Sequence, residues 1–218
     1  MKKTILIICL LLFLNLKSYA DYVPRYVDTE RYYGNGVILI KDKIKVYEKD
    51  DENSNQDAII DNETVKEAKN KKATASNTFL ISIKDKQITV LPVKYDTDEW
   101  YYICYDQSQK LFGWVKKTEN IDYYDWQDFF NIYGRKYGIY IFRNVPAGYK
   151  KLYSAPDEKS TLTDSFDFPR YISLWLINKD WMLIKATTYD GITKTGWFRW
   201  RTEKKNVIAL PDFGEMNY

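Results

Sequence analysis

The sequence predicts an all-β protein: two small β modules in tandem, joined by a short helical connector. Three observations predict it. A pattern of aromatic landmarks occurs twice, many short segments are rich in β-branched and aromatic residues, and one aromatic stripe between the two copies has helical spacing. Short strands separated by polar turns are typical of small barrels and sandwiches rather than of a parallel α/β sheet.

The doubled pattern consists of three landmarks in one order. The first copy has a Tyr-led acidic segment ending in Ser at 47–54, a Trp-x-x-Ile segment at 100–103 and Gly-Trp-Val at 113–115. The second copy has the corresponding segments at 153–160, 181–184 and 196–198. The spacing between the first two landmarks is about 25 residues longer in the first copy. We place this extra length within 55–77.

Residues 1–20 have the features of a secretory signal peptide. Lys2 and Lys3 provide the positive start, residues 5–16 are apolar, and Ser18 and Ala20 are the small residues before a cleavage site. An apolar run of roughly a dozen residues is shorter than the ~20 needed to cross a bilayer as a helix. We therefore expect an exported protein, periplasmic or extracellular, without a stable membrane span after cleavage. The alternative is an uncleaved anchor.

The strands are predicted from β-branched and aromatic runs bounded by polar turns. In the first module, residues 34–119, they are 36–40, 44–47, 79–83, 87–91, 100–105 and 111–115. In the second module, residues 139–210, they are 139–142, 151–153, 171–176, 181–185 and 195–200.

The insertion at 55–77 is rich in Asn, Lys, Asp and Ala and poor in large apolar residues. Such a composition adds little to a core. It predicts a solvated loop with one or two helical turns near 63–69, whose charges form a solvated face.

The connector, residues 120–138, carries an aromatic stripe. Trp126, Phe129, Phe130 and Tyr133 fall at i, i+3, i+4 and i+7, which predicts one face of a short helix that ends at Gly134. One interpretation is a helix that docks this stripe onto one or both modules and holds them at a fixed angle. The alternative is an exposed stripe that binds a partner.

Charge and histidine content exclude several function classes. The chain has 33 basic and 30 acidic residues, and removal of the signal peptide takes away three lysines and no acid. A net charge near zero provides no basic face for nucleic acid. The absence of histidine excludes Ser-His-Asp and Cys-His catalysis and histidine-ligated zinc. We expect no cofactor and no metal.

Cys104 is the one cysteine left in the mature chain, so an internal disulfide is excluded. Its aromatic surroundings predict a buried thiol that acts as a small hydrophobe. The alternative is a disulfide with another molecule.

The Trp-x-x-Ile and Gly-Trp-Val segments, joined by polar hairpins at 106–110 and 189–194 and preceded by a Tyr-led loop, resemble the bacterial extracellular branch of the Src-homology-3 (SH3) family. The resemblance implies two SH3-like barrels. The proline-binding signature of the eukaryotic branch is absent, so recognition of proline-rich peptides is not implied. The bacterial branch binds envelope components, which implies a cell-wall glycan or peptide, or an envelope protein, as the partner.

Strand parity selects the candidate site residues. Side chains three apart in a strand point to opposite faces, so inward Ile103 and Ile184 place Trp100 and Trp181 on the outer face. Adjacent side chains in a strand also point to opposite faces, so the Trp of each Gly-Trp segment points outward when the residue after it points inward. The ligand-binding candidates are therefore Tyr47, Trp100, Trp114, Tyr153, Trp181 and Trp197.

Two interpretations of these aromatic residues remain open. The Tyr-led loop folds over them and they form a second, minor core, which the sequence favours, or they form a platform on which a sugar or an extended peptide stacks. The acids Asp51, Glu52, Asp157 and Glu158 act as turn formers in the first case and select cationic ligands in the second.

The resulting functional prediction is an exported, non-catalytic protein that recognises a cell-envelope component, peptidoglycan or a protein. One alternative is an interaction or inhibitor protein of the periplasm without affinity for the wall. Another is a carboxylate-type hydrolase in the groove between the modules, which would need two facing acids.

Overall fold

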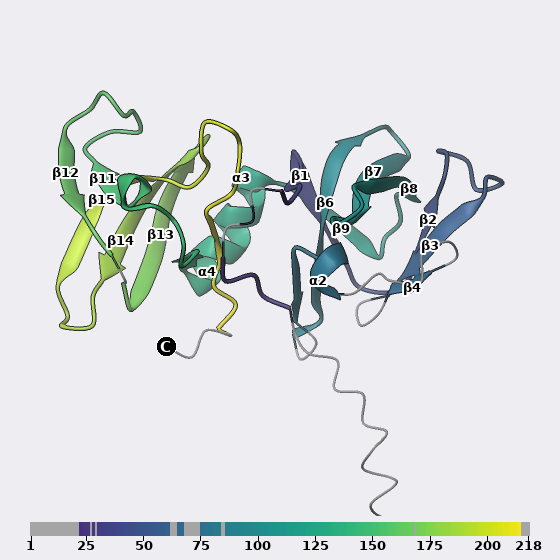
Figure 1. The fold of residues 1–218 in the computed structure, drawn as a ribbon, viewed down its shortest axis with the longest axis horizontal. Helices are drawn as coiled ribbons and strands as arrows, with labels where there is room; N and C mark the ends of the chain where they lie inside the picture. The colour runs from purple at the N-terminus through teal and green to yellow at the C-terminus, as the bar shows by residue number, and fades with distance from the viewer. Residues whose placement is uncertain are drawn as a thin grey trace, which may run out of the picture.

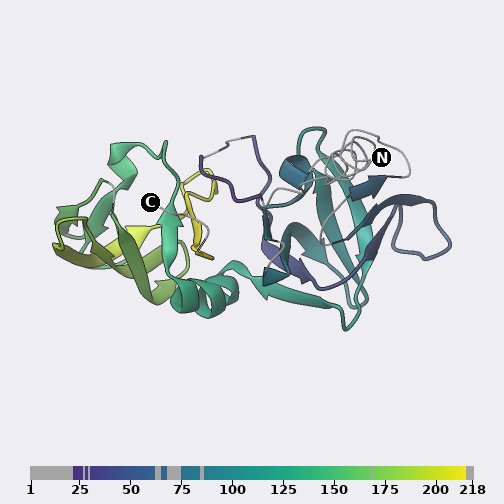
Figure 2. The ribbon, with the colours of Figure 1, turned by 90° about the horizontal axis from the view of Figure 1, so that it is seen from below.

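A computed structural model describes residues 22–26, 28, 30–61, 65–67, 75–83, 86–167 and 169–214. The predicted signal peptide lies outside them. The all-β class and the short helical connector are confirmed, and Figures 1 and 2 show two β modules with the connector helix at their junction. Within the described part of the chain, no helix has the length and apolar character needed to cross a membrane.

The first module is a nine-stranded antiparallel sheet. Its strands are β1 (Gly36–Ile40), β2 (Ile44–Tyr47), β3 (Gln56–Ile60), β4 (Val65–Glu67), β5 (Ile81–Ile83), β6 (Ile88–Asp96), β7 (Trp100–Asp106), β8 (Leu111–Lys116) and β9 (Ile121–Asp125). The strand order is β4-β3-β2-β8-β7-β6-β1-β9, with β5 paired to β6. A short helix, α2, consists of Ala75–Thr78.

The second module has a five-stranded sheet of order β12-β11-β15-β14-β13 and a separate pair, β10-β16. The strands are β10 (Ile139–Ile141), β11 (Lys151–Tyr153), β12 (Leu162–Ser165), β13 (Tyr171–Asn178), β14 (Trp181–Thr187), β15 (Thr193–Arg199) and β16 (Ala209–Pro211), and η3 is a 3₁₀ turn at Ala147–Tyr149. As hydrogen-bonded among the described residues, none of these sheets closes on itself.

The second sheet repeats part of the first. The order β12-β11-β15-β14-β13 corresponds to β3-β2-β8-β7-β6. Bulges recur at equivalent places, at Val46/Tyr47 and Leu152/Tyr153 and again at Val93/Tyr95 and Leu174/Leu176. A bulge shifts every following side chain to the other face, so its repetition keeps equivalent residues on equivalent faces.

The insertion differs from its prediction as a solvated loop. Residues Gln56–Ile60 form β3, which pairs with β2 and buries Ala58 and Ile60 completely. Residues Val65–Glu67 form strand β4 where a helical turn is predicted, and the helical turn that exists, α2, lies later. The backbone of β2 needs hydrogen-bonding partners, and two buried apolar side chains in β3 outweigh the polar composition around them.

The predicted connector begins as a strand, and its helix ends later than predicted. Residues Ile121–Asp125 form β9, paired to β1, and the Asp125 carboxylate caps the helix by accepting from the Asp128 backbone N–H at 2.8 Å. The helix then runs through α3 (Trp126–Phe129), the π-turn η2 (Phe130–Gly134) and α4 (Arg135–Tyr137). Gly134 does not end it. Gly138 does, with a φ of +82° that favours glycine.

The aromatic stripe of this helix docks onto both modules. Trp126, Phe129 and Phe130 are buried, and Trp126 Nε1 donates to the Gly34 carbonyl of the first module at 3.1 Å. The Phe130 ring lies 4.8 Å from the ring of Trp200 in the second module. The docked-connector prediction is confirmed, and the hypothesis of an exposed stripe is wrong, because these rings belong to a core shared by both modules.

Candidate functional site

The Tyr-led loops have the same internal hydrogen bonds in both modules. The Ser54 hydroxyl accepts from the Lys49 N–H at 3.2 Å and donates to the Lys49 carbonyl at 3.3 Å. Ser160 does the same with Ala155, at 3.2 and 3.1 Å. The serine that ends each loop therefore closes it onto its own start.

In each loop, the aspartate of the candidate acidic pair forms a turn, as one interpretation predicted. The Asp51 carboxylate accepts from the Asn53 N–H at 2.9 Å, and Asp157 accepts from the Lys159 N–H at 3.0 Å. These Asx-type contacts hold the backbone of each loop.

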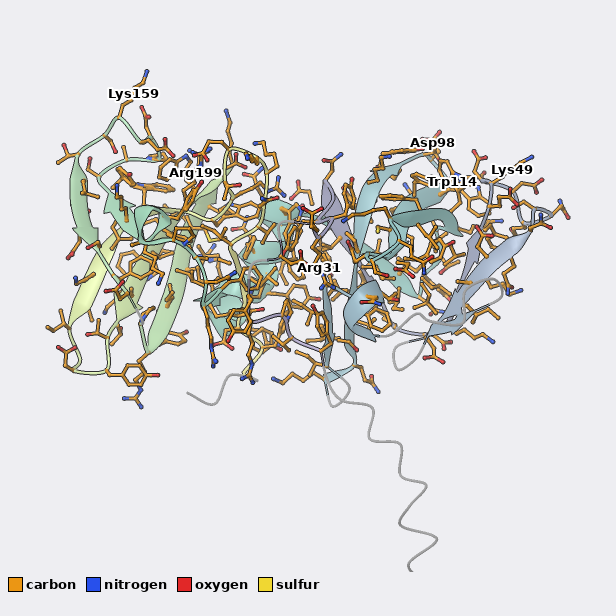
Figure 3. All side chains as sticks on the ribbon, viewed as in Figure 1. Arg31, Lys49, Asp98, Trp114, Lys159 and Arg199 are labelled. Atoms are coloured by element: carbon orange, nitrogen blue, oxygen red, sulfur yellow. The ribbon has the colours of Figure 1, made fainter. Side chains whose placement is uncertain are left out.

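In each loop, the glutamate of the candidate acidic pair forms an ion pair with the residue two after the Trp of the Gly-Trp segment. Glu52 pairs with Lys116, and Glu158 pairs with Arg199. Figure 3 shows Arg199 in the second module, and Lys159 at the tip of its loop. In both modules this ion pair ties the loop to the Gly-Trp strand.

The Tyr and Trp that begin the first two landmarks form an edge-to-face pair in each module. Tyr47 meets Trp100 with ring centroids 5.7 Å apart, and Tyr153 meets Trp181 at 5.5 Å, both at an interplanar angle of 89°. Trp100 is 6% exposed and Tyr47 is 9% exposed. Burial excludes Trp100 and Tyr47 as a stacking platform, and for them the second-core interpretation holds. Tyr153 and Trp181 are half-buried.

Strand parity places the remaining motif residues as predicted. Ile103 and Ile184 are fully buried, and the residues after the motif tryptophans, Val115 and Phe198, are buried on the same inner faces. Trp114 therefore lies on the outer face of its sheet, and Figure 3 labels it in the part of the first module far from the connector helix. It remains half-buried, and so does Trp197.

Trp114 belongs to a larger cluster that we call the first aromatic face: Tyr32, Tyr95, Tyr102, Phe112 and Trp114. Tyr102 is opposite both Trp114 and Tyr95 in the strand register, so the three rings share one face of β6-β7-β8. Tyr102 lies 4.8 Å from Trp114 and 4.9 Å from Tyr95, and Phe112 lies 5.7 Å from Tyr102. Tyr32 meets Phe112 at 5.2 Å. Five contacting rings, each partly exposed, thus form one continuous surface.

An ammonium group lies over the centre of this face. Lys94 Nζ is 4.8 Å from the centroid of Phe112 and 5.7 Å from that of Tyr102. Both distances are within the range of a cation–π contact. No ion pair joins this ammonium to another described residue.

The second module has an apolar counterpart of this face. Leu183 is opposite both Trp197 and Leu176, as Tyr102 is opposite Trp114 and Tyr95. Leu176 is 51% exposed and the neighbouring Trp175 is 45% exposed. The same position in the fold is therefore aromatic in one module and mainly aliphatic in the other.

Four members of the first aromatic face are absent from the candidates that the sequence predicts: Tyr32, Tyr95, Tyr102 and Phe112. Parity alone indicates two of them, because Tyr102 is two residues after Trp100 and Phe112 two before Trp114. Tyr95 follows the β6 bulge, and Tyr32 precedes β1 without regular structure. Neither position follows from the period of a strand.

Cys104 is buried and free, as predicted. Burial raises the pKa of its thiol to about 12. A thiol that stays protonated in the fold but ionises in the unfolded chain lowers stability as pH rises above its unfolded pKa towards 12.

We expect native Cys104 at pH 8 to react with a chromogenic disulfide reagent on the order of 100-fold more slowly than in denaturant, because attack requires an exposed thiolate. Absorbance of the released thiol measures the rate, and the denatured protein is the control. Equal rates with and without denaturant would contradict the burial of this thiol.

In the described part of the chain, no three Asp, Glu, Cys or His side chains gather closely enough to hold a metal ion. Asp122 forms an ion pair with Lys41, and Asp125 caps the connector helix.

Contacting rings offer flat apolar area, and Lys94 adds one positive charge beside it. No model of a protein family and no curated protein matches the chain.

Proposed function

We propose that the chain is an exported, non-catalytic binding protein whose tandem SH3-like modules recognise a cell-envelope component, peptidoglycan or an envelope protein. The observation that carries the proposal is the first aromatic face: five contacting, partly exposed rings on the outer side of an antiparallel sheet. An exposed aromatic cluster of this kind typically marks an interaction site.

The chemistry of the face fits a glycan or an extended peptide. Sugar rings and peptide planes stack on aromatic faces, and the tyrosine hydroxyls add hydrogen bonds at the edges. The Lys94 ammonium would contact a carboxylate carried by such a ligand. The predicted signal peptide supports export, and the absence of histidine supports a non-catalytic role.

Co-sedimentation with purified peptidoglycan tests the proposal. We expect the variant Tyr102→Ala/Trp114→Ala to bind about tenfold more weakly than wild type, because central aromatic anchors typically contribute more than 1 kcal/mol each. Tyr26→Ala is the matched control, since Tyr26 is 56% exposed and lies outside the face. Its binding should be unchanged.

The possible outcomes separate the parts of the proposal. Undiminished sedimentation of the double variant, with its fold verified by circular dichroism, would contradict the role of this face. If wild-type protein does not sediment, peptidoglycan is excluded and an envelope protein is the component to test.

A further inference from the structure

A pocket of about 260 Å³ lies beside the Tyr-led loop of the first module. Three lysines line it: Lys43 before β2, Lys45 in β2 and Lys116 at the end of β8. Its apolar walls include Ile44 and Val115, whose side chains are buried in the module core. These walls are therefore part of the packed core, and the three lysines add positive charge to the pocket.

The charge of this pocket is only partly neutralised. Glu52 is the one acid that lines it, and its carboxylate already pairs with Lys116. Lys43 and Lys45 are exposed, and their ammonium groups make no ion pair or hydrogen bond with any described residue. Two positive charges at the pocket thus have no partner within the described chain.

The second module has a counterpart of this site in which the partners belong to the chain itself. Counting from the equivalent residues Tyr47 and Tyr153, Lys43 corresponds to Tyr149, and the pair Lys116–Glu52 corresponds to Arg199–Glu158. There, a second carboxylate is present. Glu203, in the loop after β15, also pairs with Arg199 and accepts a hydrogen bond from the Tyr149 hydroxyl at 3.0 Å.

Glu203 is held there as an anion. The pKa of its carboxyl is lowered, first by a backbone hydrogen bond and then by the Tyr149 hydroxyl and the Arg199 charge. One basic residue thus holds two carboxylates, one from the Tyr-led loop and one from the loop after the Gly-Trp strand.

Among the described residues of the first module, Glu52 is the one carboxylate in ion-pair contact with Lys116, and Glu99 acts on this ammonium only through its charge. Glu203 is four residues after Arg199, and the residue four after Lys116 is Asn120. The neighbouring acid, Glu119, is exposed and forms no ion pair with a described residue. The position that Glu203 fills in one module is therefore open in the other.

We propose that the pocket of Lys43, Lys45 and Lys116 binds a carboxylate of another molecule, supplied by an acidic peptide, in the place that Glu203 takes in the second module. Its volume suits one side chain or a chain end rather than a whole drug-sized ligand. A lysine ammonium has three donors, so Lys116 can hold both Glu52 and a second carboxylate.

An NMR titration of the mature protein with short peptides tests this proposal. The probe is the blocked peptide acetyl-Ala-Ala-Glu-Ala-Ala-amide, compared with the same peptide carrying Gln. We expect saturable shifts of the amides around 43–47 and 116–118 with the Glu peptide, with Kd on the order of 1 mM, and none with the Gln peptide. Acetylated pentaalanine with a free or an amidated C-terminus distinguishes a terminal carboxylate from a side-chain one.

Two sets of variants test the place of binding. Lys43→Gln/Lys45→Gln should weaken binding of the carboxylate probe roughly tenfold. Lys159→Gln, which removes a charge from the exposed loop tip of the second module, is the matched control and should not change it. Asn120→Glu should fill the pocket from within and also weaken binding, and Glu203→Gln should open a second site with shifts around Tyr149 and Arg199.

Equal binding of the Glu and Gln peptides, or full binding by the double lysine variant, would overturn the proposal. These outcomes are independent of peptidoglycan sedimentation, because the three lysines lie outside the first aromatic face.

Discussion

Replacement of Trp126 by alanine is expected to lower the free energy of unfolding by about 3–5 kcal/mol. Trp126 is 3% exposed, and its ring lies 5.7 Å from Trp200, 5.8 Å from Phe129 and 5.9 Å from Phe130. The truncation leaves a cavity among these rings and removes the hydrogen bond from Nε1 to the Gly34 carbonyl. Urea denaturation followed by circular dichroism measures the loss.

The same substitution should also separate the unfolding of the two modules. Trp126 joins Gly34 in the first module to Trp200 in the second, so we expect its removal to weaken the coupling between the unfolding of the two modules. We expect one transition in wild type and two in the Trp126→Ala variant, with thermal unfolding by calorimetry as the measurement. Trp126→Phe, which keeps a ring but removes the indole N–H, should have a smaller effect.

Trp175→Ala is the control, because Trp175 is 45% exposed and its loss should change stability by about 0.5 kcal/mol or less. A single transition in Trp126→Ala with a loss below 1 kcal/mol would show that the connector does not couple the modules.

The position of the connector helix follows from its sequence, but its end does not. The aromatic spacing from Trp126 to Tyr133 is a local property of the chain, and the helix is where that spacing predicts. Gly134 looks like a stop signal because glycine weakens helices by about 1 kcal/mol. In the fold a Cβ there would lie 2.9 Å from Leu174 Cδ2, so this glycine permits the helix to pack against β13. That contact joins residues 40 positions apart in the sequence, so a local sequence pattern cannot predict it.

For a related reason, strand β3 is not predicted from the sequence. Its sequence, Gln-Asp-Ala-Ile-Ile, is followed by a long polar segment. When composition is averaged over the whole insertion, the two apolar side chains that β3 buries are outweighed by polar residues. Pairing with β2 decides its structure. The residues at the same distance after the second Tyr-led loop also form a strand, β12, which is not predicted from the sequence either.

The candidate site was predictable in part. Parity correctly separates Trp114 from Val115, because it depends only on the extended backbone. Whether an outward ring is exposed depends on what covers it, and this differs between motif positions. The Tyr47 ring packs against Trp100, while Trp114 is surrounded by rings from β6 and β7 that leave it half open.

Replacement of Gly113 by alanine is expected to destabilise the protein by about 1–3 kcal/mol through overpacking. A Cβ at this position would overlap Val46 Cγ1 and lie 3.1 Å from the Tyr47 carbonyl oxygen. The equivalent Gly196 would place its Cβ 2.8 Å from Leu152 Cβ and 3.2 Å from the Tyr153 carbonyl oxygen. In both modules, the glycine before the motif Trp therefore lies where the Tyr-led strand crosses the Gly-Trp strand at close range.

Urea denaturation of Gly113→Ala, with Gly148→Ala as the control, measures this effect. A Cβ at Gly148 meets nothing within 4 Å, so the control should be neutral or slightly stabilising. Val46→Ala removes the methyl group that the new Cβ would overlap. In a double-mutant cycle, the two substitutions should together cost less than the sum of their separate effects, by about 0.5 kcal/mol or more. If the effects are additive and Gly113→Ala is neutral, the glycine is not required by the crossing. If the effects couple, packing between the two strands is enough to explain why glycine stands before the motif Trp, without reference to ligand binding.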